Sequence, residues 1–224
     1  MKENELLNRT LEIIKSEGVV RAYNYLVNNL DKINGLSSQV YNYLYCLAAT
    51  SERNNETLDW LEEAIIKEGM WYRPEVFEDE DLDSIRDDNR FINCYIISKE
   101  RYLQNLKTTK PIGTWKTKNA DNLLLILHGN QQNIEICKES WDPLKSGNYQ
   151  VEYLQSKELD SYQLYRWEEE GEGPSQLKET IDYIDWNNYN NRILCGFSSG
   201  CNVILRGITD YDINCDKIIL QSPW

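Results

Sequence analysis

The sequence predicts an α/β fold in two parts, an all-helical N-terminal region followed by a mostly parallel sheet with helices on its faces. From Leu6 to Leu106, apolar residues recur at spacings of three and four, which is typical of short amphipathic helices. Beyond Gly113 the pattern changes to short apolar runs that alternate with helical segments. The first of these runs, Leu123 to Leu127, is continuously apolar, as expected of a strand buried on both faces.

The composition is that of a folded, acidic protein. Hydrophobic residues make up 41% of the 224 residues and the net charge is −13. No stripe of Lys and Arg offsets this charge, so nucleic acid is not expected as a partner. No apolar stretch approaches the roughly 20 residues that span a bilayer, and the segment Met1 to Glu5 lacks the apolar part of a signal peptide. We therefore expect a cytoplasmic protein without membrane contact.

Neither the cysteines nor the acidic runs indicate a metal site or a cofactor. The six cysteines are scattered and include no C-x-x-C pair, so we expect free, mostly buried thiols. The acidic runs Glu78 to Asp81 and Glu168 to Glu170 lack the spacing of a calcium-binding loop, which favours solvated surface. The sequence therefore predicts a protein that needs neither a metal ion nor an organic cofactor for its chemistry.

The N-terminal region predicts a series of helical hairpins. Gly18 and Asn34-Gly35 interrupt the first amphipathic segments, where helix stops are expected. Two further helices, Gln39 to Thr50 and Glu56 to Glu68, are separated by the polar turn Ser51 to Asn55.

The hairpin from Tyr41 to Gly69 resembles a tetratricopeptide repeat. Its second helix has Leu61 and Ala64 at the spacing where that family places a large apolar and a small residue. Thr57 and the pair Leu44-Tyr45 depart from the family pattern, so no ligand-groove residues can be carried over. The resemblance implies a region that binds a protein or peptide partner.

The polar stretch Lys107 to Gly113 marks the predicted domain boundary, because Pro111 and Gly113 interrupt the helical pattern. This gives a helical domain at 1–110 and an α/β domain at 111–224. The second domain is predicted to order its elements as β-α-β-α-β-α-β, namely strand 123–127, helix 131–145, strand 149–154, helix 174–186, strand 192–195, helix 199–208 and strand 217–220.

The motif Gly196-Phe197-Ser198-Ser199-Gly200 lies between the strand that ends at Cys195 and the helix that follows. A serine on a sharp strand-to-helix turn between two glycines is the pattern of a nucleophile elbow. The glycines allow a strained turn and close helix packing, and the helix directs its N-terminal amides at the same point. The alternative is that Ser198 is only a small residue in a glycine-flanked turn.

A second motif lies about 70 residues upstream, where His128-Gly129-Asn130 follows the first strand. Together the two motifs resemble the α/β-hydrolase superfamily over residues 122 to 224, with closest likeness to dienelactone-hydrolase and carboxylesterase-type members. The resemblance implies a three-layer sandwich with Ser198 as nucleophile and the amides of Asn130 and Ser199 as oxyanion hole. By the same resemblance, His128 and Gly129 brace the loop, and Gln155 and Trp167 line the substrate pocket.

Two members of the family's triad, the acid and the histidine, are not found in their expected places after Ser198. The family places an acid and then a histidine after the serine, whereas His128, the only histidine, precedes Ser198. The aspartates at 210, 212 and 216 lie before the last predicted strand, at the end of the sheet opposite the elbow. We expect a hydrolase domain truncated after about its sixth strand; the alternative is a naturally short homologue that has lost the chemistry.

Two functional hypotheses follow. The first is a serine hydrolase that acts on a small carboxylic ester or related acyl substrate through an acyl-Ser198 intermediate, with little or no activity in these 224 residues. The second is a non-catalytic module that binds a protein through its helical region and keeps a hydrolase-like scaffold.

Overall fold

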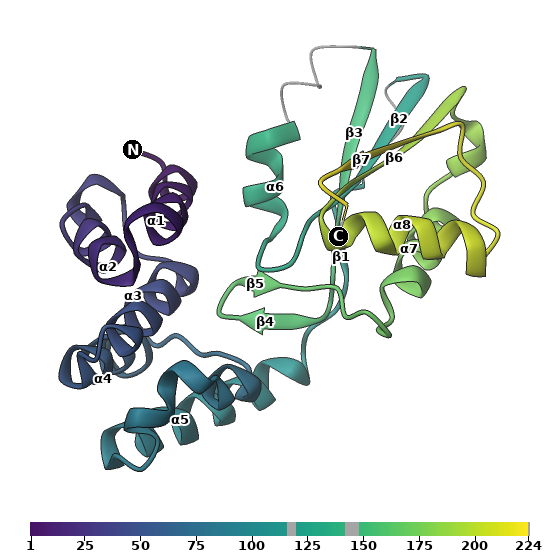
Figure 1. The fold of residues 1–224 in the computed structure, drawn as a ribbon. Helices are drawn as coiled ribbons and strands as arrows, with labels where there is room; N and C mark the ends of the chain where they lie inside the picture. The colour runs from purple at the N-terminus through teal and green to yellow at the C-terminus, as the bar shows by residue number, and fades with distance from the viewer. Residues whose placement is uncertain (116–119, 142–147, 224) are drawn as a thin grey trace. The chain divides into compact units, whose positions relative to one another are not determined.

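The computed structural model describes residues 1–115, 120–141 and 148–223, and these form two compact units (Figure 1). The first unit is Met1–Lys107 and the second is Thr108–Trp224. The first is all helical and the second is an α/β unit. This arrangement confirms the predicted fold class.

The first unit consists of helices joined by short turns. Its elements are α1 (Glu3–Glu17), α2 (Val19–Val27), the 3₁₀ turn η1 (Leu30–Lys32), α3 (Ser38–Thr50), α4 (Asn54–Glu62), the π-helical turn η2 (Glu63–Lys67), the 3₁₀ segments η3 (Pro74–Glu78) and η4 (Glu80–Ile85), and α5 (Asn89–Leu106). Within the described residues, no helix is long and apolar enough to cross a membrane.

Each helix of this unit packs against the next one along the chain. Gly18, with φ 88°, separates α1 from α2 at the place where the sequence predicts a stop. The Ser37 hydroxyl accepts a hydrogen bond from the Val40 amide and caps α3. The core between the hairpins includes the fully buried side chains of Leu26, Leu44 and Leu61. Burial of apolar faces on successive helices therefore holds the unit together.

The helix predicted from Glu56 to Glu68 changes its geometry before it ends. Residues Glu63–Lys67 form η2, whose wider turn departs from the regular helical hydrogen-bond pattern. The guanidinium of Arg101, on α5, donates hydrogen bonds to the carbonyl oxygens of Ile65 and Met70. A side chain distant in sequence therefore stabilises the irregular turn.

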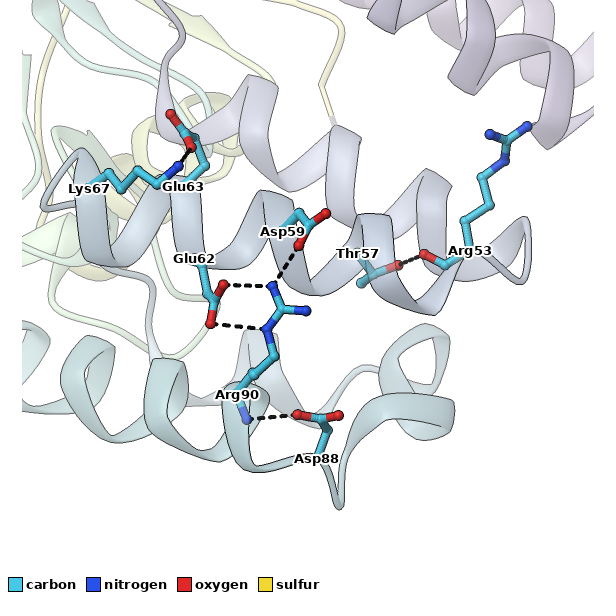
Figure 2. A network of polar contacts seen from close by, with 8 residues as sticks. All are labelled: Arg53, Thr57, Asp59, Glu62, Glu63, Lys67, Asp88 and Arg90. Atoms are coloured by element: carbon cyan, nitrogen blue, oxygen red, sulfur yellow. Dashed lines mark hydrogen bonds and ion pairs between the residues drawn. The ribbon is translucent and has the colours of Figure 1, made fainter.

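Arg90 joins α5 to α4 through three hydrogen bonds (Figure 2). Its Nε lies 3.1 Å from one carboxylate oxygen of Glu62, and its Nη2 lies 2.6 Å from the other. The same Nη2 lies 2.6 Å from Asp59 Oδ1. These carboxylates raise the pKa of the guanidinium, chiefly by hydrogen bonding. The two-pronged contact with Glu62 fixes the orientation as well as the charge.

We predict that Arg90→Met lowers the free energy of unfolding by about 1 kcal/mol, because a bidentate pair between two helices is lost while solvent screens its charge. The matched control is Arg9→Met, since Arg9 pairs with Glu12 only within α1. Urea denaturation of both variants checks this. Equal destabilisation of the two variants would contradict the proposed difference.

The second unit is built on a five-stranded sheet with the order β1-β3-β2-β6-β7. Its elements are β1 (Ile112–Gly113), β2 (Asn122–Leu127), α6 (Ile134–Trp141), β3 (Tyr149–Gln155), β4 (Leu159–Ser161), β5 (Leu164–Tyr165), α7 (Gly173–Tyr183), the 3₁₀ turn η6 (Trp186–Asn188), β6 (Asn191–Phe197), α8 (Ser199–Asp210) and β7 (Lys217–Gln221). The strands β3, β2, β6 and β7 are parallel, and β1 pairs antiparallel with β3.

Alternate side chains of the central strands enter two separate cores. Leu123, Leu125 and Leu127 of β2 pack with residues of α7 and α8, whereas Leu124 and Ile126 pack with residues of α6. Helices therefore cover both faces of the sheet, with α6 on one face and α7 and α8 on the other (Figure 1). This explains why the run in β2 is apolar without alternation.

Several elements differ from those predicted. The short strands β1, β4 and β5 were not expected, and β4 pairs antiparallel with β5 in a sheet of its own. The helix expected at 131–145 begins only at Ile134, because Gln131 has φ 58° and the Asn133 side chain caps the Ile136 amide. Part of that prediction, 142–145, lies outside the described residues. The helix expected at 174–186 ends at Tyr183.

Candidate active site

The two predicted motifs meet at the carboxyl ends of β2 and β6. These strands are parallel neighbours, and Leu127 pairs with Gly196 at the end of their register. The chain leaves β2 through α6 toward β3 on one side, and leaves β6 through α8 toward β7 on the other. Such a reversal opens a crevice at the carboxyl end of an α/β sheet, which is where this kind of fold binds ligands.

Ser198 has a strained backbone at the junction of β6 and α8. Its φ of 48° and ψ of −121° are rare for a residue with a side chain. The Ser198 amide donates to the Gln221 carbonyl oxygen at 3.0 Å, and its carbonyl oxygen accepts from the Cys201 amide at 2.9 Å. The half-buried side chain makes no hydrogen bond with any residue in the described part of the chain.

Three glycines make this junction sterically feasible. A Cβ on Gly200 would lie 2.5 Å from the His128 carbonyl oxygen, and one on Gly196 would lie 2.8 Å from the Cys201 amide nitrogen. A Cβ on Gly129 would lie 2.7 Å from the Phe197 ring. The first two obstacles are backbone atoms, which side-chain rearrangement cannot remove. The backbone of helix α8 therefore packs directly against the backbone of β6 and of the end of β2, with no room for a side chain between them.

His128 is buried and both of its ring nitrogens are occupied. Its Nε2 accepts a hydrogen bond from the Ser156 amide at 3.1 Å, so its Nδ1 carries the proton and donates to the Gly129 carbonyl oxygen at 2.6 Å. The ring stacks on Trp167, with centroids 5.0 Å apart. Burial lowers the pKa of His128 to about 4. These contacts hold a neutral histidine inside the loop, and neither nitrogen reaches Ser198.

Asn130 connects three segments around the elbow. Its Oδ1 accepts hydrogen bonds from the Ser199 hydroxyl and from the Trp167 amide, each at 2.8 Å. Within the described residues, the backbone amides of Asn130 and Ser199 donate to no acceptor. The loop after β2 and the start of α8 thus leave two amides available for a ligand.

A pocket of about 490 Å³ adjoins these two residues. Asn130 and Ser199 line it together with Trp167, Pro174, Val203 and Leu205. Charged side chains in its lining come from the loop 168–170 and from Arg166 and Arg206. The indole of Trp167 is fixed because its Nε1 donates to the His128 carbonyl oxygen at 2.8 Å. The pocket therefore has an apolar wall held by the same loop that positions Asn130.

Gln155, the other residue expected to line the pocket, is not among the lining residues. Its side chain is buried, and its Oε1 accepts a hydrogen bond from the Ile134 amide at the start of α6. The side chain caps a helix on the other face of the sheet.

The sequence did not predict two residues that hold the loops of the site in place. Gln132 Oε1 accepts from the Gly129 amide at 2.9 Å and so closes the loop after β2. The Glu158 carboxylate accepts from the amides of Glu168 and Glu172 and holds the loop that carries Trp167. Burial raises the pKa of Glu158. No motif marks either residue, because each role depends on partners that only the fold brings together.

The aspartates near the last strand lie far from the elbow, as their place before β7 predicts. Asp216 forms an ion pair with Arg192 at the start of β6, with Nε to Oδ2 at 3.0 Å. Hydrogen bonds from the side chain and the backbone of Arg192 lower the pKa of Asp216 to about 2. Across the described ranges, no group of three His, Cys, Asp or Glu side chains is placed to hold a metal ion.

We predict that Gly200→Ala lowers the free energy of unfolding by about 3 kcal/mol or more, because the new methyl group overlaps the backbone oxygens of Leu127 and His128. Gly207→Ala, in the same helix, is the matched control. Its methyl group meets only the side-chain ends of Ile213 and Leu177, so the change stays within about 1 kcal/mol. Urea denaturation compares them, and equal tolerance of the two substitutions would contradict the close approach.

We predict that His128 makes stability fall on acidification. The folded protein keeps the ring neutral down to about pH 4, whereas the unfolded chain protonates it below its ordinary pKa of 6.5. Acid therefore favours the unfolded state, by about 2 kcal/mol between pH 7 and pH 5. The measurement is the difference in this pH dependence between the natural chain and His128→Gln. Identical pH dependences would rule out a buried neutral ring.

Comparisons with known proteins give a family for the first unit. Residues 2–106 match the family described as A/B hydrolase-like, N-terminal domain. The chain is also 30% identical to an uncharacterized protein from Bacillus cereus ATCC 10987, over 100% of this chain and 74% of that one, with a TM-score of 0.49. A search of curated proteins found no match. The first unit is therefore similar to this N-terminal domain over residues 2–106, and a mostly parallel α/β unit follows it in the chain.

Proposed function

We propose that the second unit carries the nucleophile of a serine hydrolase, which acts on a carboxylic ester or related acyl compound through an acyl-Ser198 intermediate. The observation that carries this proposal is the backbone of Ser198, whose φ of 48° is strained for a serine. Such strain persists only where the surrounding structure imposes it, and it is common at catalytic positions. Here the strain presents a hydroxyl beside a helix N-terminus.

The two available amides support the same chemistry. Attack by Ser198 Oγ on an acyl carbon forms a tetrahedral intermediate with a negatively charged oxygen. The amides of Asn130 and Ser199 are the donors proposed to bind that oxygen. Donors fixed in advance are worth about 3 to 4 kcal/mol each in acyl transfer, because they need no rearrangement as charge develops. The hydrogen bond from Ser199 to Asn130 holds the two segments together.

The adjoining pocket supports an acyl substrate of modest size. At about 490 Å³ it falls within the range of small-molecule sites, and Trp167, Val203 and Leu205 give it an apolar wall. Arg166, Arg206 and the acidic loop 168–170 add charged side chains to its lining.

The general base is the part that these 224 residues do not supply. His128 is the only histidine, and its two nitrogens bond to Gly129 and Ser156. A serine hydroxyl without a base reacts slowly at neutral pH. We therefore propose that turnover requires a base from outside these 224 residues, and that the 224-residue chain alone has little or no activity.

The second candidate function is a non-catalytic protein in which the helical region binds a partner. The observation that favours it is this same engagement of His128, which leaves Ser198 without a base. The predicted likeness to tetratricopeptide repeats is part of this candidate. The coding sequence beyond Trp224 distinguishes the two candidate functions. A histidine encoded there, and thus after Ser198, favours the enzyme.

A fluorophosphonate probe tests the first candidate directly. We predict that the full-length protein is labelled and that Ser198→Ala removes the label. The 224-residue chain is expected to label slowly, and added imidazole is expected to increase its rate by acting as an external base. The measurement is labelled protein against time, read by mass spectrometry.

The control is Ser175→Ala, which removes a half-buried hydroxyl on α7 and should leave labelling unchanged. Labelling that persists in Ser198→Ala would assign the reaction to another residue. Complete absence of labelling in the full-length protein would favour the binding candidate.

A further inference from the structure

Helix α5 carries an apolar stripe that the first unit does not cover. Ile92, Ile96, Leu103 and Leu106 are 42%, 49%, 45% and 44% exposed. Together with Lys99 they follow spacings of four, three, four and three residues. Residues at these spacings lie along one face of a helix and form the repeat by which helices pair in coiled coils.

The opposite face of α5 already packs against the rest of the unit. Phe91, Cys94 and Ser98 are its buried residues, and Arg90 fixes its first turn to α4. It is also the last helix of the first unit in chain order (Figure 1). Terminal helices of stacked arrays normally present a polar outer face. Helix α5 instead exposes four aliphatic side chains along one face, as expected of a surface that binds another helix.

Lys99 indicates what kind of helix fits this stripe. It is exposed, and its Nζ contacts only the hydroxyl and ring of Tyr95 on the same helix, with no carboxylate partner in the described residues. It occupies the middle of the five positions. Symmetric pairing of two α5 helices, parallel in register or antiparallel about the centre, would therefore place Lys99 against its own copy. Like charges at such a position disfavour self-association.

We propose that α5 is a docking surface for one amphipathic helix of another protein, with aliphatic residues opposite Ile92, Ile96, Leu103 and Leu106 and an Asp or Glu opposite Lys99. The aliphatic contacts supply the affinity, and the charge pair fixes the register. This interaction goes beyond the hydrolase chemistry and is independent of whether Ser198 reacts.

Two synthetic helical peptides of about three heptads test this proposal. Both carry Leu at the seam positions, with Glu in one and Lys in the other at the central position that faces Lys99. Fluorescence anisotropy with the 224-residue chain measures their affinities. We predict that the Glu peptide binds at least about threefold more tightly than the Lys peptide. In Lys99→Glu, the preference is expected to reverse.

Ile96→Glu should abolish binding of both peptides, because it places a charge in the seam. Its matched control is Val20→Glu, since Val20 is also 49% exposed but lies on α2. Circular dichroism confirms that each variant is folded. Equal affinity for the two peptides, no binding, or the same loss in Val20→Glu would overturn the proposal. So would a concentration-dependent dimer of the natural chain that Ile96→Glu dissociates.

Discussion

The candidate active site depends on the backbone-to-backbone approach of α8 to β2 and β6. Gly196 and Gly200 provide it, because at both positions a side chain would overlap backbone atoms of a neighbouring segment. The approach brings the N-terminus of α8 beside the loop after β2, so that Ser198 lies next to Gly129 and the side chains of Ser199 and Asn130 are joined by a hydrogen bond. Without it, the strained turn at Ser198 would have no structure to hold it.

Around that contact, buried polar groups are satisfied by one another. The Ser156 amide binds His128, the indole of Trp167 binds the His128 carbonyl oxygen, and the Trp167 amide binds Asn130. Loss of any partner would leave a buried donor or acceptor unpaired, which costs about 1 to 3 kcal/mol. The network therefore keeps the crevice in one arrangement before any ligand arrives, which is the condition for electrostatic catalysis.

The sequence could predict the fold class and the backbone of the elbow because both are encoded by local periodicity and glycine placement. It could not predict the β4–β5 hairpin, whose strands have three and two residues and whose position depends on the bridge between Gln132 and Tyr165. The π-helical turn η2 was missed for a similar reason, since the carbonyl oxygen of Ile65 within it accepts a hydrogen bond from Arg101 of α5. Contacts between distant segments decide these features, and no local pattern reports them.

The side chain of Asn130 constrains how the pocket of such a protein can change in evolution. One amide oxygen holds both the start of α8 and the segment with Trp167, so the proposed oxyanion donors and the apolar pocket wall share a single anchor. Reshaping the pocket through that segment would also disturb the amides proposed as oxyanion donors. New substrate preferences are therefore easier to acquire at Leu205, a pocket-lining residue of α8 that is 40% exposed.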